Sequence, residues 1–285
     1  MMRHPEPDML PAASAEQAPA RRSTGTLAFA RKAVAIADME LRKLRRDPTE
    51  LVTRAVQPVL WLVVFGEVMA RARMIDTGGT PYLAFLVPGV LAQSVLFIAI
   101  FNGISVIWER DLGIIHKFLA SPTPRAALVI GKALGGGIRA LVQAAVVLAL
   151  AVLLGVHLSW RPVSMCGAVG LVLLGAMVFS SFSLSIACIV KTRERFMGVG
   201  QVLTMPLFFA SNAIYPTSMM PFWLQFVSHV NPLTYQIDGL RALLLPAGAG
   251  VPAAHIGLWT DFGVLVAALV ALVMLSARLY PAIVR

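Results

Sequence analysis

The chain carries few side chains that could do chemistry, and their spacing fits no catalytic or metal-binding arrangement. Its five histidines are scattered, at positions 4, 116, 157, 229 and 255. The two cysteines, Cys166 and Cys188, lie inside apolar runs and show neither a disulfide framework nor zinc-site spacing. No paired carboxylates are expected within the apolar runs. The sequence therefore predicts a chain without a metal site and without a catalytic centre of its own.

A nucleotide-binding loop is not expected either. The phosphate-binding motif requires a glycine five positions before a Gly-Lys pair and a serine or threonine after it. Gly131 and Lys132 have no such upstream glycine, and Ala133 follows them. Gly135, Gly136 and Gly137 lie inside an apolar run with no preceding strand, which predicts close helix packing rather than phosphate binding.

Composition identifies the class of protein that must position these residues. Of the 285 residues, 58% are hydrophobic and 13% are charged, and the mean hydropathy is +0.78. Soluble domains carry about 25% charged residues. The apolar residues form runs of about 20, the length that a helix needs to cross a bilayer. The net charge of +10 comes from basic residues flanking these runs, which favours membrane topology over nucleic-acid binding.

We therefore predict an all-α integral membrane protein, since lipid offers no partner to unpaired backbone groups. Residues 48–285 are expected to form six transmembrane helices: Leu51–Ala70, Tyr82–Ile107, Ala127–Leu154, Val163–Val190, Phe196–Ile214 and Phe262–Leu279. Twenty Lys and Arg residues fall on one side of this arrangement, counting Arg139 with the segment between spans two and three, and four fall on the other. The asymmetry predicts that both termini are cytoplasmic. Within span four, the Ser180–Ser185 cluster is expected to hold helices together.

The region before the first span is expected to have two parts. Residues 1–25 are predicted to be a disordered cytoplasmic tail, with no cleavable signal peptide because the first long apolar run begins near Leu51. Residues 26–47 repeat apolar side chains at three- and four-residue steps, with basic residues on the other faces. This pattern predicts an amphipathic helix in the headgroup plane. A short cytoplasmic helix without membrane contact is the alternative.

The segment between spans two and three is too charged to lie in lipid. Leu112, Ile115 and Leu119 share one helical face, and Pro122 and Pro124 end that helix. Residues 108–126 are therefore predicted to hold a short, rigidly mounted cytoplasmic helix, suited to receiving a push from another protein. The alternative is an amphipathic connector resting on the membrane.

The segment between spans five and six, residues 215–246, is apolar but interrupted by Pro216, Pro221 and Pro232. Each piece, at about 1.5 Å rise per residue, reaches only about half-way through the bilayer. We predict a re-entrant helical pair before the last span, held against protein. A surface-lying aromatic loop is the alternative.

These two segments, in this order, resemble the type-2 permeases of bacterial ABC exporters, a family that includes drug and lipo-oligosaccharide exporter permeases. The matching positions in the first segment are Glu109, Arg110, Gly113, Leu119, Ser121, Pro122, Arg125, Gly131 and Lys132. Those in the second are Pro221, Trp223, Leu224, Asn231, Pro232, Leu233, Tyr235 and Arg241. His116 departs from the family, many of whose members have Glu there. The resemblance covers residues 27–281.

The resemblance implies a non-catalytic transmembrane subunit that works as a dimer, with a second copy or a related permease, in the bacterial cytoplasmic membrane. A separate ABC ATPase would bind ATP and Mg, and this chain would bind no cofactor. Expected substrates are an amphipathic drug, a lipid or a lipid-linked saccharide. The ATPase-coupling residues would be Glu109, Arg110, Gly113, His116, Lys117, Leu119, Pro122 and Arg125. Those of a re-entrant gate would be Pro221, Trp223, Asn231, Pro232, Tyr235 and Arg241.

A polar stripe in span five is a further candidate site. Gln201, Thr204, Phe208 and Ser211 are expected on one helical face, where they could line a substrate pathway or a dimer seam. Hydrogen bonding between helices is the alternative for each of them. Among other functions, a membrane scaffold would leave residues 108–132 unexplained. A secondary transporter is disfavoured because no membrane-buried carboxylate is expected.

Overall fold

The computed structural model describes residues 56–112, 125–190, 192–246 and 257–279. Within these ranges the secondary structure is helical and contains no strand. The predicted tail, the amphipathic helix and most of the coupling segment at residues 108–126 lie outside the described residues. So do the side chains of residues 125–127.

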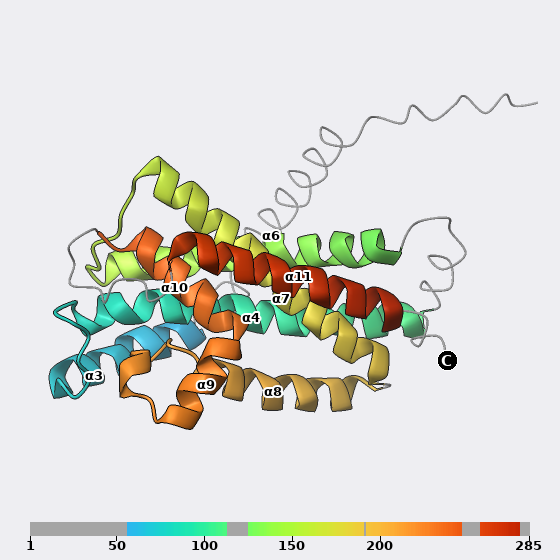
Figure 1. Ribbon diagram of the computed structural model, residues 1–285, viewed down its shortest axis with the longest axis horizontal. Coiled ribbons are helices and arrows are strands. Elements are labelled where there is room, and N and C mark those ends of the chain that lie inside the picture. The colour runs from blue at the N-terminus through green and yellow to red at the C-terminus, as the bar shows by residue number, and fades with distance from the viewer. Residues whose placement is uncertain (1–55, 113–124, 191, 247–256, 280–285) are drawn as a thin grey trace, which may run out of the picture.

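The described helices form one elongated bundle. In Figure 1, α4, α6, α7, α8 and α11 run lengthwise, whereas the shorter α9 and α10 are inclined to them. Residues 56–59 begin a helix that continues through η1 and α3. The elements are η1 (Leu60–Gly66), α3 (Glu67–Ala72), α4 (Tyr82–Asp111), α6 (Arg125–Leu153), α7 (Pro162–Ile189), α8 (Arg193–Phe209), η2 (Thr217–Met219), α9 (Phe222–Val230), α10 (Pro232–Leu244) and α11 (Leu258–Leu279).

Four described helices are long and apolar enough to cross a membrane. They comprise Tyr82–Asp111, Leu128–Leu153, Pro162–Ile189 and Leu258–Leu279, and they coincide with predicted spans two, three, four and six. The protein is thus a multi-pass, all-helical membrane protein. The first predicted span, of which residues 56–70 are described, and α8, with 17 residues, are not among the four. The count of six spans remains a prediction.

Several boundaries differ from the sequence prediction, among them the start of the last span, which was expected at Phe262 and lies at Leu258. The second span was expected to end at Ile107, but α4 continues as a helix to Asp111. The fifth was expected to reach Ile214, but α8 ends at Phe209. The hydroxyl of Ser211 explains the early end, because it donates to the carbonyl of Phe208 at 2.6 Å and accepts from the amide of Ala213 at 3.3 Å. A serine that bonds to nearby backbone in this way competes with the helical ladder.

Small residues bring the long helices close together. Gly103 of α4 faces Ser183 of α7, where a Cβ would collide with the serine side chain. The Ser183 hydroxyl donates to the backbone carbonyl of Ile100. On the other side of α7, Ser276 of α11 donates to the carbonyl of Ser181 at 2.8 Å. The Ser180–Ser185 cluster thus joins α7 to both neighbours, as membrane helices commonly do with small polar residues.

The helix of residues 56–72, here called the N-terminal helix, packs at the edge of the bundle through aromatic rings. The ring centroid of Trp61 lies 5.0 Å from that of Phe65 and 5.1 Å from that of Phe208 in α8. The outward faces of this helix and of α8 are apolar, and their exposed side chains include Val56, Leu60, Val64, Val68, Met197, Val202, Met205 and Phe209. Apolar surface of this extent is typical of contact with lipid or another chain.

Substitution of Gly103 by alanine tests the α4–α7 contact. The added Cβ would lie 2.6 Å from the Phe196 ring and 3.1 Å from the Ser183 carbonyl oxygen, and overpacking of this kind costs about 1–3 kcal/mol. We expect a lower midpoint of thermal unfolding in detergent. The matched control is Gly135→Ala, because no described atom lies within 4 Å of a Cβ at Gly135. That change should be neutral or stabilise by up to about 1 kcal/mol; equal effects of the two would contradict the packing.

Candidate functional sites at the two ends of the bundle

One end of the bundle, here called the ionic end, holds a cluster of charges from α4, α6 and α8. Asp111, the last residue of α4, accepts a hydrogen bond from Arg193, the first residue of α8, with an N–O distance of 2.8 Å. Arg110 approaches the same carboxylate at 3.1 Å. The guanidinium of Arg193 also lies 3.7 Å from the ring centroid of Trp108. These contacts fix the end of α4 to the start of α8.

A second ionic contact ties α4 to α6. The ammonium group of Lys132 donates to the carboxylate of Glu109. About two turns deeper along α4, the Asn102 side chain donates to the carbonyl of Lys132 at 3.3 Å and accepts from Arg139 at 3.1 Å. The charge count had assigned Arg139 to the segment between spans two and three. The structure places it in the middle of α6. Its long side chain reaches a polar partner on α4, as membrane-buried arginines require.

The described residues include only part of the predicted coupling site. Glu109 and Arg110 lie in the last turn of α4. Gly113, His116, Lys117, Leu119 and Pro122 lie outside the described residues, as does the side chain of Arg125. Their coupling role remains a prediction. Asp111 and Arg193 were missed as site residues, although opposite charges at the ends of two predicted helices were a usable signal.

The other end of the bundle, here called the opposite end, contains the short helices α9 and α10. α10 runs antiparallel to α7, with glycines at the contacts: Gln236 lies against Gly175, and Leu243 lies against Gly167. Gly175 is roughly 20 Å along α7 from its start at Pro162, at 1.5 Å per residue, and α7 has 28 residues. α10 therefore begins about half-way along α7 and returns toward the opposite end (Figure 1).

The turn between α9 and α10 is held by Asn231. Its side-chain oxygen accepts from the amide of Leu233 at 3.0 Å, which caps α10, and Pro232 occupies the first helical position. Its amide nitrogen donates to the carbonyl of Leu207 in α8 at 2.7 Å. The hydroxyl of Tyr235 donates to the carbonyl of His229 at 2.7 Å. The turn is thus bound to α8 through Asn231, and the bond from Tyr235 to His229 connects α10 to the end of α9.

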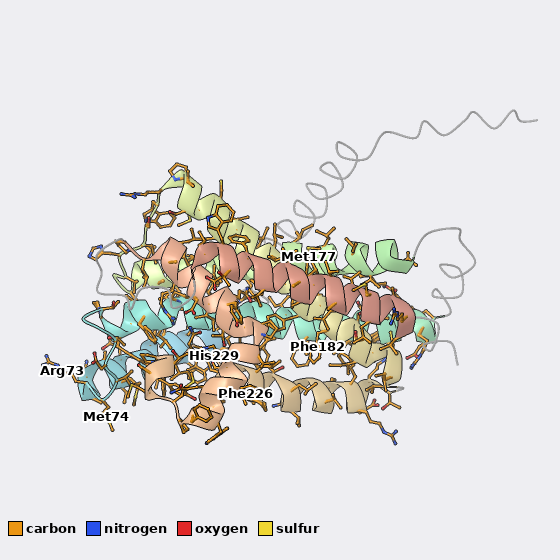
Figure 2. All side chains as sticks on the ribbon, viewed as in Figure 1. Arg73, Met74, Met177, Phe182, Phe226 and His229 are labelled. Carbon is orange, nitrogen blue, oxygen red and sulfur yellow. The ribbon has the colours of Figure 1, made fainter. Side chains whose placement is uncertain are left out.

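α9 is exposed along most of its length. Pro221, the N-cap residue, and Trp223 are both exposed. Figure 2 labels Phe226 and His229 on this helix at the edge of the bundle. Exposed aromatic side chains of this kind favour a membrane–water interface.

Arg241 lies at the centre of a buried polar cluster. Its guanidinium donates to the carboxylate of Asp238 at 3.2 Å and to the carbonyl of Asn212 at 2.9 Å. It also lies 4.1 Å from the ring centroid of Phe85 in α4. The Asn212 side chain donates to Asp238. The cluster therefore joins α10 to the segment that follows α8 and to α4. A gating role for Arg241 remains a prediction.

Two buried carboxylates contradict the expectation that the membrane-embedded part has none. Asp238 of α10 is 6% exposed, and Asp261 of α11 is fully buried. Sequence reasoning missed them for two reasons: Asp238 lies in the proline-broken segment, which was not counted as a span, and Asp261 immediately precedes the predicted start of span six at Phe262. The described residues hold no group of three or more potential metal ligands among His, Cys, Asp and Glu.

The predicted stripe in α8 is divided by the structure. Thr204, Phe208 and Ser211 are buried, whereas Gln201 is exposed. Phe208 contacts the N-terminal helix through Trp61, and the Thr204 hydroxyl donates to the carbonyl of Gly200 one turn earlier at 2.6 Å. Whether these residues line a pathway or a dimer seam remains a prediction.

Comparison with known proteins gives this geometry a context. Residues 31–245 match the family described as ABC-2 type transporter. The chain is 30% identical to the transport permease ycf38 of Cyanophora paradoxa over 203 residues, or 70% of each chain. It is 29% identical over 228 residues to the inner membrane transport permease YadH of Escherichia coli K12, covering 78% of this chain and 83% of YadH. The daunorubicin resistance ABC transporter permease protein DrrB1 of Streptomyces coeruleorubidus is 25% identical over 69% of each chain.

Replacement of Arg241 by methionine tests the buried cluster. Loss of the guanidinium leaves the Asp238 carboxylate buried beside Asn212 without its cationic partner, and breaking a buried pair from one side costs about 3–5 kcal/mol. We expect a marked fall in the thermal unfolding midpoint. The double variant Arg241→Met, Asp238→Leu removes both charges and should recover most of the loss. A single variant no less stable than the double one would show that the pair is not a buried ion pair.

Proposed function

The chain belongs to the ABC-2 type transporter family, and from this membership we propose that it is the transmembrane subunit of an ATP-driven exporter and forms its substrate translocation pathway. The family normally works with an ABC ATPase subunit. In this proposal the separate ATPase binds ATP and Mg, and this chain holds no cofactor. A second copy, or a related permease, completes the pathway in the bacterial cytoplasmic membrane.

The ionic end is the observation that carries this proposal. Glu109 and Asp111 at the end of α4 pair with Lys132 in the first part of α6 and with Arg193 at the start of α8. In the sequence, this end of α4 leads directly into the predicted coupling helix. Partly exposed charges at a helix end are unsuited to lipid and well suited to a protein surface in water. The excess of basic residues on this side supports a cytoplasmic position, facing the ATPase.

The contacts of α8 suggest how force would cross the membrane. Arg193 at its start is bound to the end of α4, and the carbonyl of Leu207 near its other end accepts from Asn231 at the α9–α10 turn. These two attachment points are about 21 Å apart along the helix at 1.5 Å per residue. ATP-driven closure of the ATPases would press on the coupling helix, shift α4 and α8 together, and move the re-entrant pair.

An amphipathic substrate is supported by a groove beside this route. α8 and α9 enclose an apolar groove of about 400 Å³ whose lining includes Leu203, Leu207, Phe226 and Val230. The name of one relative associates it with daunorubicin resistance, which favours an amphipathic drug. A lipid or a lipid-linked saccharide has the same division into apolar and polar parts.

Two other functions are separable by experiment. A membrane scaffold without transport activity would share the topology and the family fold. A proton-coupled secondary transporter gains support from the buried carboxylates Asp238 and Asp261, since such residues mark ion pathways in carriers.

Reconstitution with and without the ATPase tests the function. The permease would be purified with its partner ATPase and both would be reconstituted in vesicles. Export of a fluorescent amphipathic drug would then be followed. ATP should drive export, and a variant of the ATPase that cannot hydrolyse ATP should abolish it. Export by the permease alone in a proton gradient would instead establish a secondary transporter. Absence of both export and drug-stimulated hydrolysis would favour a scaffold.

Charge exchange between Asp111 and Arg193 tests the proposed route of force. Asp111→Arg places like charges against Arg193 and should separate the ends of α4 and α8, so that ATP hydrolysis continues but export per ATP falls severalfold. The double variant Asp111→Arg, Arg193→Asp restores opposite charges and should recover export. If the single variant retains full coupling, the contact does not transmit force.

A further inference from the structure

A pocket lined by residues with polar groups leads inward between η2, α9 and α10. It measures about 260 Å³ and is lined by Thr217, Ser218, Gln225, Ser228, His229, Thr234 and Asp238. Ser218 and His229 at its rim are exposed, whereas Ser228, Thr234 and Asp238 at its floor are buried. A polar cavity of this size can hold several water molecules. It can therefore bring water from the surface at this end to the Asp238 carboxylate.

Asp261 lies beyond Asp238 on the side of α11. It is fully buried, and neither of its carboxylate oxygens has a hydrogen-bond partner among the described residues. It lies next to Gly239 of α10, where an added Cβ would be 3.6 Å from an Asp261 oxygen. Asp238 directly precedes Gly239 in α10, so its negative charge lies near Asp261.

Among the described side chains, the surrounding helices offer Asp261 no compensating cation of its own. α10 contributes Tyr235, Asp238 and Arg241, and the guanidinium of Arg241 is bound to Asp238. The only titratable side chains of α7 are the thiols of Cys166 and Cys188. Of the described side chains of α6, Lys132 and Arg139 are titratable, and both belong to the network at the ionic end. α11 adds only Arg278, in its last turn.

Gln236 of α10 is a further buried polar side chain without hydrogen-bond partners among the described residues. It is fully buried against Gly175, and neither its amide oxygen nor its amide nitrogen has a partner among the described residues. An ionised carboxylate without a partner is costly in such surroundings, and a buried acid becomes neutral instead. Of the two acids, Asp238 keeps its charge because Arg241 and Asn212 donate to it.

We propose that Asp261 is a proton-binding site, which exchanges its proton with external water through the polar pocket and Asp238. With the proton bound, Asp261 packs neutrally against Gly239, and α10 stays attached to α11. Loss of the proton places a second negative charge beside Asp238, and the repulsion loosens α10 from α11. The site thus makes the α9–α10 pair sensitive to the acidity at this end of the bundle. It requires no contribution from a partner ATPase.

Infrared spectroscopy of the purified permease in lipid nanodiscs tests the site directly. A protonated carboxyl group has a C=O absorption that is separate from carboxylate and amide bands. In heavy water at neutral pH, the wild type should show this absorption, and it should disappear in alkaline buffer. Asp261→Asn should lack it. Asp76→Asn is the matched control, because Asp76 lies in a loop, accepts a hydrogen bond from the amide of Gly78 at 2.9 Å, and should not contribute.

A second variant tests the role of the neighbouring acid. Asp238→Asn removes the repelling charge, so the Asp261 absorption should disappear at a lower pH than in the wild type. The helical amide band of the same spectra reports whether each variant is folded. An absorption that persists unchanged in Asp261→Asn, or is missing from the folded wild type at neutral pH, overturns the proposal. So does its removal by sodium ions at constant pH, which would assign a metal cation to the site.

Discussion

A helix too short to cross the bilayer needs a protein surface beside it to be re-entrant, as predicted for α10, and the glycines of α7 provide that surface. Gly167 and Gly175 leave room for Leu243 and Gln236, so the backbones of α7 and α10 approach closely. Polar side chains that lipid would exclude are brought inside by the same contact. Arg241 donates there to the Asp238 carboxylate and to the Asn212 carbonyl. The geometry of this whole end of the molecule follows from that close approach.

Much of the fold could be predicted because the apolar runs are long and uninterrupted. α4, α6, α7 and α11 begin and end within a few residues of their predicted bounds, because the length of a run is set by the bilayer. The end of α8 could not be predicted in the same way. It depends on a serine hydroxyl, that of Ser211, bonding to its own backbone, and an apolar run gives no sign of that choice.

The candidate sites were predictable where a local motif specifies them. Asn231 and Pro232 form a helix start whatever surrounds them, and the structure shows that cap. The pairing of Asp111 with Arg193 joins residues 82 positions apart, which periodicity does not reveal. Asp261 was overlooked because a carboxylate next to an apolar run is ordinarily assigned to the interface. Only the packing of α10 over it shows that it is buried.

The α4–α7 contact has a consequence for movement. The Ser183 hydroxyl reaches the Ile100 backbone at a place where only glycine, Gly103, fits. Two helices joined so closely cannot slide along each other without breaking the bond and forcing a side chain into the opposing backbone. α11 is fastened to α7 in the same manner through Ser276. α4, α7 and α11 must therefore move as one rigid body, with α10 packed against its glycines. Any rearrangement has to turn this body as a whole relative to α8 and α9.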